Sequence, residues 1–148
     1  MIEIRDLTYA YVPGRPILSR INLQLKDGES VTILGRNGSG KSTLLRCIVG
    51  LLDPTAGEIR APSASSMPAV GLVFQNPDDQ IVSPTVESEA AFGLENLAVP
   101  TAEMRRRVDE ILDQFGLAGH KGSDPHKLSG GERQRLAIVS IAVMNPQF

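Results

Sequence analysis

A glycine-rich run beginning at residue 35 has the residue types and spacing to bind phosphate groups. It reads Gly-Arg-Asn-Gly-Ser-Gly-Lys-Ser, with a threonine next. Glycines let the backbone curl so that successive N–H groups face inward and hold an anion. In this pattern the lysine reaches the β- and γ-phosphates of a nucleotide, and the following hydroxyl binds Mg²⁺. The nucleotide-contacting residues predicted here are Gly35, Asn37, Gly38, Ser39, Gly40, Lys41, Ser42 and Thr43, with Ser42 on Mg²⁺ and Thr43 near the α-phosphate.

The elements expected around this loop are those that the phosphate-binding pattern requires. Ser30–Leu34 is short, apolar and rich in β-branched residues, which predicts a buried strand. A helix is expected from Lys41 to about Leu51, and the positive end of its dipole faces the loop. A plain glycine turn between a strand and a helix is the alternative. The strand-loop-helix context favours nucleotide phosphate binding over that alternative, although a P-loop alone does not separate kinases, GTPases and motors.

A second glycine-containing run opens the last predicted helix, Glu132–Met144. It reads Leu-Ser-Gly-Gly-Glu from residue 128. Free N–H groups and a positive helix end at this point suit a γ-phosphate. One chain would then present two phosphate-binding helix ends that cannot both reach the same ATP. An ordinary Gly-Gly helix start is the alternative.

The run Leu128–Arg135 resembles the signature sequence of ATP-binding cassette (ABC) proteins, and further motifs of that family lie in order along the chain. The resemblance implies an α/β P-loop NTPase fold. Its parts are a RecA-like core, here incomplete, an N-terminal antiparallel β subdomain and an α-helical signature subdomain. It also implies a head-to-tail dimer with ATP between the glycine loop of one subunit and Ser129, Gly130, Gly131 and Glu132 of the other.

Two single residues match further positions of the family. Tyr11 resembles the aromatic residue that stacks on adenine, and plain packing is its alternative; its neighbour Tyr9 is expected to pack. Gln75 resembles the glutamine that reaches Mg²⁺ and the attacking water and that senses the transmembrane partner. Its alternative is a polar residue that opens a loop.

The stretch that begins Phe-Gln-Asn-Pro-Asp-Asp-Gln at residue 74 indicates a subgroup. With its continuation to Asn96, it resembles the ATPase subunits of energy-coupling factor transporters and of related cobalt and nickel uptake systems. Such machines import vitamins or transition metals, and their membrane subunits choose the substrate. In that group Gln80 is a further polar residue at the same site. Drug or lipid exporters and amino-acid importers are the alternatives within the family.

The family continues after the signature helix with an aliphatic strand that ends in Asp-Glu, the Walker B motif, and with a switch histidine. The sequence ends at Phe148, before these motifs. We therefore expect one incomplete ATP-binding domain, with the β subdomain and P-loop over 1–75 and the Q-loop and helical subdomain over 76–144. We expect these 148 residues to bind ATP with little hydrolysis and low stability. A non-hydrolysing nucleotide-binding regulator and a soluble cassette of DNA repair or translation are the alternatives.

Composition sets the remaining expectations. The chain is 41% hydrophobic, which is typical of a globular domain, and its formal net charge of −2 is no strongly basic balance that would argue for nucleic acid as the main partner. The single cysteine, Cys47, forms no internal disulfide and is expected to be buried. No apolar run approaches the roughly 20 residues of a membrane span. We expect a peripheral protein at the cytoplasmic face of the membrane, bound to transmembrane subunits and a second, identical or paralogous cassette.

Other elements are predicted from the spacing of apolar residues and from residues that begin or end helices and strands. Thr101 is expected to cap its helix and Gly116 to end it. The histidines His120 and His126 lack a cysteine partner and are expected not to bind metal. Residues 61–69 are expected to form a mobile loop. The predicted strands are Ile2–Leu7, Ile17–Leu25 and Val70–Phe74, and the predicted helices are Thr85–Phe92 and Thr101–Phe115.

Overall fold

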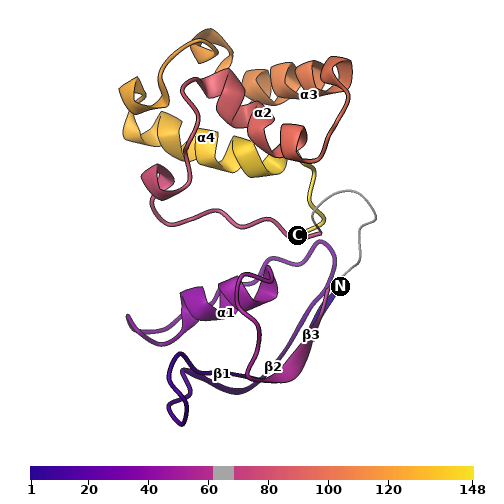
Figure 1. Cartoon of the computed structure of the whole chain (residues 1–148), viewed down its shortest axis with the longest axis vertical. Helices are drawn as coiled ribbons and strands as arrows, with labels where there is room; N and C mark the ends of the chain where they lie inside the picture. Colours follow the sequence, from indigo (N-terminus) through magenta and orange to yellow (C-terminus); the bar gives the residue numbers. More distant parts are fainter. Residues whose placement is uncertain (62–68) are drawn as a thin grey trace. The chain divides into compact units, whose positions relative to one another are not determined.

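The computed structural model describes residues 1–61 and 69–148, which fall into two compact units (Figure 1). The first unit covers Met1–Ala64 together with Gln147–Phe148, and the second covers Ser65–Pro146. Most of the loop predicted at 61–69 lies outside the described residues. The predicted subdomain division at residue 75 remains a prediction.

The first unit contains a three-stranded antiparallel sheet in the order β2-β1-β3. The strands are β1 (Ile2–Tyr9), β2 (Leu18–Leu25) and β3 (Ala56–Arg60). The first two confirm the predicted strands, whereas β3 was missed because its short Ala-Gly-Glu-Ile-Arg run has no apolar alternation. Gly57 of β3 has φ +84°, and a Cβ there would collide with the backbone carbonyls of Arg5 and Asp6. β3 therefore pairs with β1 at a point where only glycine fits.

One helix, α1 (Lys41–Ile48), completes the described secondary structure of this unit (Figure 1). It ends before the predicted Leu51, because Gly50 adopts φ +75° and its N–H returns to the Cys47 carbonyl at 3.1 Å. Cys47 is buried, as predicted. The buried apolar residues of this unit are Ile2, Ile4, Leu7, Leu18, Leu44, Cys47 and Ile48.

Two of the predicted buried strands do not form among the described residues. Neither Ser30–Leu34 nor Val70–Phe74 takes part in a ladder within residues 1–61 and 69–148. Leu34 is 87% exposed and Phe74 is 37% exposed. A parallel core strand obtains its hydrogen bonds from neighbouring strands, and helices cover both of its faces. Without such neighbours in the described chain, the apolar sequence alone does not make a strand.

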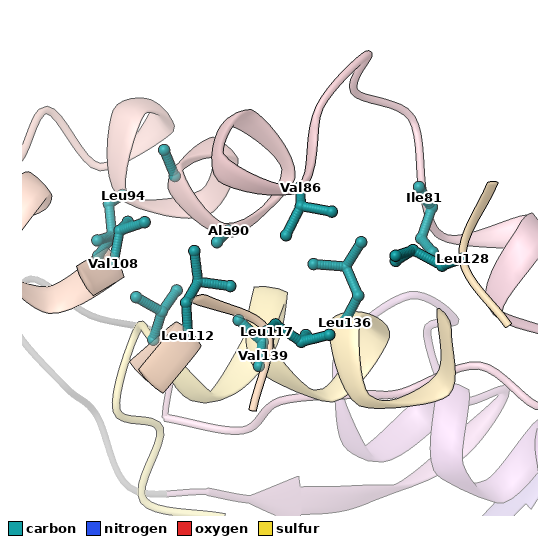
Figure 2. Close-up of a cluster of buried hydrophobic side chains, with 12 residues drawn as sticks. Ile81, Val86, Ala90, Leu94, Val108, Leu112, Leu117, Leu128, Leu136 and Val139 are labelled. Carbon is teal, nitrogen blue, oxygen red and sulfur yellow. The ribbon is translucent and has the colours of Figure 1, made fainter. Parts of the chain in front are cut away.

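The second unit is helical, and its helices enclose one apolar core (Figure 2). Side chains from the three long helices point toward one another, with Leu94, Leu112 and Leu136 fully buried. Its long helices are α2 (Val86–Asn96), α3 (Thr101–Gln114) and α4 (Gly130–Ala142). Its short 3₁₀ turns are η1 (Pro77–Asp79), η2 (Ala118–His120) and η3 (Pro125–Lys127).

Local capping decides where these helices begin and end. Thr85 and Ser88 form a capping box, after which α2 runs past the predicted end at Phe92. The predicted cap of α3 by Thr101 is wrong: Pro100 precedes the helix, Thr101 is its first residue, and no side chain caps it. Gly116, with φ +67°, follows the last turn as predicted.

Across the described ranges, 1–61 and 69–148, none of the helices combines the length and apolar character needed to cross a membrane.

Candidate nucleotide-binding site

Three glycines of the phosphate-binding loop each have a steric reason to lack a side chain. Gly38 and Gly40 adopt φ +81° and +90°, in the left-handed region that favours glycine. A Cβ on Gly35 would lie 2.6 Å from Ser39 Oγ, and one on Gly40 would lie 2.8 Å from Leu18 Cδ2. The loop is therefore tightly curled on itself and packed against the start of β2.

The loop feeds into a helix end that is left uncapped. Gly40 is the N-cap of α1 and offers no side-chain cap. The first backbone bond entering the helix runs from Leu44 N–H to the Gly40 carbonyl at 2.8 Å. The N–H groups of residues 41–43 precede this bond and have no intrahelical acceptor. Together with the helix dipole they form an anion-binding end.

Lys41 lies across the loop that it is predicted to serve. Its Nζ donates to the carbonyls of Gly35 at 2.8 Å and Arg36 at 3.0 Å. The loop carbonyls thus hold the ammonium over the curled backbone, where a phosphate oxygen can replace them as acceptor. Ser42, the next residue, is exposed, so its hydroxyl is open to a cation.

Tyr11 lies next to the first turn of α1. Its hydroxyl is 3.3 Å from Thr43 Oγ1, and its side chain is 55% exposed. Tyr9 packs edge-on against it, with ring centroids 4.9 Å apart and an interplanar angle of 83°. Desolvation raises the pKa of Tyr9, which fits a packing role for that ring. The structure therefore brings Tyr11 together with the predicted phosphate-contacting residues and leaves much of its ring open to a planar base.

Gln75 and the signature residues belong to the second unit. Gln75 lies in a bend directly before η1, and its side chain is exposed. Gln80, which the resemblance places at the same site, is instead engaged inside this unit. Its Nε2 donates to the Ala137 carbonyl at 2.7 Å and to Ser140 Oγ at 2.9 Å, and its Oε1 accepts the Phe74 N–H at 3.0 Å.

The signature run forms a capping box at the start of α4. Glu132 Oε2 accepts the Ser129 N–H at 2.8 Å and the Ser129 hydroxyl at 2.7 Å, and Ser129 Oγ accepts the Glu132 N–H at 3.4 Å. These bonds from Ser129 hold the pKa of Glu132 below its usual range. The expectation of free N–H groups is therefore corrected at Glu132, whose N–H is capped. Gly130 keeps an open approach, because a Cβ there would meet no atom within 4 Å.

His120 is a neighbour of the signature that the sequence does not indicate. Its Nε2 is 3.5 Å from Glu132 Oε1, although the two residues lie far apart in the chain. The turn η2 ends at His120 and brings it to the start of α4. Within residues 1–61 and 69–148, no group of three or more His, Cys, Asp or Glu side chains is arranged to hold a metal ion.

The first-unit residues fit a nucleoside triphosphate with its magnesium ion. The curled glycine loop and the uncapped helix end offer N–H donors to phosphate oxygens. Lys41 adds one positive charge, held by the loop carbonyls, and the Ser42 hydroxyl is an oxygen ligand of the kind Mg²⁺ prefers. The chemistry of the donors therefore matches the ligand expected from the sequence.

Comparisons with known proteins match the chain to one family. The profile of the family described as ABC transporter matches residues 18–148. The energy-coupling factor transporter ATP-binding protein EcfA of Methanothermobacter thermautotrophicus is 45% identical over 158 aligned residues, covering 100% of this chain and 51% of that protein. The protein of the same name from Methanocaldococcus jannaschii is 43% identical, covering 99% of this chain and 56% of its own length. This chain thus spans about half the length of the curated relatives it matches.

Solved structures of ABC transporter subunits match the fold of this chain. The structure of cbiO1 from Clostridium perfringens, described as part of the ABC transporter complex cbiONQ, matches with a TM-score of 0.81 and 36% identity. The match covers 98% of this chain and 62% of that one. A structure described as the ATP-binding subunit of an ABC transporter matches with a TM-score of 0.80 and 25% identity. The fold is therefore of the α/β P-loop NTPase type found in ABC ATPases.

Proposed function

Because this chain belongs to the ABC transporter family, we propose that it binds ATP with Mg²⁺ as the nucleotide-binding part of an importer of the energy-coupling factor type. The observation that carries the proposal is the curled loop 35–40, which leads into an uncapped α1 with Lys41 lying across it. The named relatives support the transporter type, and vitamins or transition-metal ions are the cargo proposed by resemblance.

Each first-unit residue has a proposed role in binding. The loop N–H groups and Lys41 hold the β- and γ-phosphates, and Thr43 lies near the α-phosphate. Tyr11 stacks on the adenine, with its hydroxyl on Thr43 fixing one edge of the ring. Ser42 would hold Mg²⁺, which would neutralise phosphate charge and so favour transfer of the terminal phosphoryl group. The role of Gln75 toward Mg²⁺ and water is proposed from the resemblance alone.

The signature acts in trans in this proposal. Ser129, Gly130, Gly131 and Glu132 contact the γ-phosphate held by the glycine loop of a second cassette, identical or paralogous. In the capping box the Ser129 hydroxyl already donates its proton to Glu132, so it is not free for a phosphate. A phosphate must take over that proton as acceptor, so binding exchanges one charge-assisted hydrogen bond for another.

ATP hydrolysis is the family's activity. The residues assigned above account for the binding of ATP, which is the first step of that activity. Within residues 1–61 and 69–148, Gln75 is assigned to the attacking water, and no carboxylate is assigned as its base. We therefore propose that the 148-residue chain alone binds ATP and hydrolyses little of it. The protein acts at the cytoplasmic face of the membrane through transmembrane subunits.

Nucleotide titration of the purified chain tests the proposal. Mg·ATP affinity, measured by calorimetry, is compared between the original chain and Lys41→Met. Loss of one charge-assisted contact should weaken binding by about 10- to 100-fold. Lys26→Met is the matched control, since Lys26 lies in an exposed turn of the same unit. Equal affinity of Lys41→Met and the original chain would refute the phosphate site, as would absence of binding to the original chain.

A further inference from the structure

The segment that follows Gln75 is fastened to α4 at two places. Near the end of that helix, the Gln80 amide donates to Ala137 O and Ser140 Oγ, at 2.7 and 2.9 Å. Near its beginning, Arg133 Nε pairs with Asp78 Oδ1 at 3.4 Å. A helix rises about 1.5 Å per residue, so the two attachments are about 10 Å apart along α4. The segment thus runs along α4, held mainly by the Gln80 amide, because the Arg133–Asp78 pair is partly exposed and weak.

Gln80 also reaches backward along its own chain. Its Oε1 accepts the backbone N–H of Phe74 at 3.0 Å, immediately before Gln75. The backbone at 71–74 joins no ladder among the described residues, so this side-chain oxygen takes the place of a strand partner. One amide therefore links the signature helix to the peptide that leads into Gln75.

The environment strengthens the α4 end of this link, which is partly buried, whereas its Phe74 end is exposed. Gln80 is partly buried, and Ala137 and Ser140 are buried in the face of α4 that it meets. Ser140 Oγ itself donates to Ala137 O at 3.1 Å, so the three groups form a small connected network. Removing the amide would leave the buried acceptors of α4 without this donor, which costs more than the hydrogen bonds gain. The Phe74 N–H is exposed, so its loss is the net value of one hydrogen bond.

We propose that Gln80 is a positioning residue that holds the Phe74–Gln75 backbone on the signature helix and so sets where the Gln75 side chain lies. The proposal rests on the proposed function, in which Gln75 serves Mg²⁺ and water. It assigns Gln80 itself no contact with nucleotide. Gln75 and the α4 end that carries the signature then move as one body within the second unit.

Amide exchange measured by NMR tests the link directly in the 148-residue chain. In Gln80→Met the Phe74 amide should exchange at least about fivefold faster, because one net hydrogen bond is lost. Gln114→Met is the matched control: Gln114 is an exposed glutamine at the end of α3 in the same unit. Unchanged exchange at Phe74 in Gln80→Met would overturn the proposal.

A metal-dependence measurement separates positioning from a merely structural role. The ratio of ATP affinity with Mg²⁺ to that with EDTA is measured for Gln80→Met, Gln75→Ala and the double variant. Gln80→Met should lower this ratio about as much as Gln75→Ala does, roughly fivefold, and the double variant no further. A ratio unchanged by Gln80→Met overturns the positioning role. If the original chain binds no ATP, the proposed function fails, and Phe74 exchange still decides on the link.

A second variant covers the case in which Gln80→Met does not fold. Gln80→Glu keeps an oxygen that could face the Phe74 N–H, but it loses both donors toward α4 and places a carboxylate against Ala137 O. Without donors toward α4, the side chain at position 80 is no longer fixed, and its oxygen no longer stays on the Phe74 N–H. Exchange at Phe74 should therefore again accelerate. Exchange equal to that of the original chain in Gln80→Glu would contradict the two-ended link.

Discussion

Alanine substitution of the glycines with positive φ separates two reasons for glycine in the phosphate-binding loop. Gly38 needs only its left-handed backbone, since a Cβ there would meet nothing within 4 Å. Gly40 needs the backbone and the space, because a Cβ would lie 2.8 Å from Leu18 Cδ2 and 3.2 Å from Ile17 O. The left-handed conformation costs an alanine about 1–2 kcal/mol, and overpacking adds about 1–3 kcal/mol. We therefore expect Gly38→Ala to lose about 1–2 kcal/mol and Gly40→Ala about 2–5 kcal/mol.

The single cysteine allows this measurement to be confined to the first unit. Cys47 lies buried in α1, so its rate of alkylation in increasing urea reports unfolding around the loop. Gly14→Ala is the control, because Gly14 has φ +78° and open space but lies outside the loop. It should match Gly38→Ala in stability and leave ATP affinity unchanged. Equal stability of Gly40→Ala and Gly38→Ala, within about 0.5 kcal/mol, would refute the packing of Gly40 against Leu18.

Three further predictions concern the core, an ion pair and the thiol. Leu136→Ala should cost about 2–5 kcal/mol in urea unfolding followed by circular dichroism, since Leu136 is fully buried; a loss below 1 kcal/mol would contradict this core. Arg106 and Arg107 lower the pKa of Glu103 from 4.5 to about 2, so this stabilisation is complete above pH 4.5 and is lost as pH falls toward 2. Unfolding curves of Glu103→Gln and the original chain should therefore converge over that window, and a constant gap would argue against the pairing. Burial raises the pKa of Cys47, so iodoacetamide at pH 8 should label it more slowly than in urea; equal rates would refute its burial.

The phosphate-binding loop was accessible to sequence reasoning because its parts are neighbours in the chain. The glycine spacing and the helix start at Lys41 are local, and local chemistry sets them. The capping box of Ser129 and Glu132 is equally local, but from the sequence we expected free N–H groups there. The strands at 30–34 and 70–74 were predicted and are absent from the described ladders. Their apolar composition indicates that they can be buried, but a β-ladder also needs a partner strand.

Contacts between distant residues explain what the sequence did not show. β3 pairs with β1 because Gly57 fits between two carbonyls more than fifty residues earlier in the chain, and nothing in its own five residues indicates that partner. Gln80 has a sequence position typical of a site residue, yet its side-chain amide forms hydrogen bonds with the Phe74 N–H and with α4.

The sequence by itself determined the glycine spacing of the loop, the start of the helix at Lys41 and the family to which these motifs point, since each depends on residues within a few positions of one another. Only the tertiary structure decided that Tyr11 meets Thr43, that Lys41 is held over the loop, and that Gln80 joins Phe74 to the signature helix. The physical reason is that a side-chain hydrogen bond depends on separation in space, and folding brings together atoms that the chain keeps far apart.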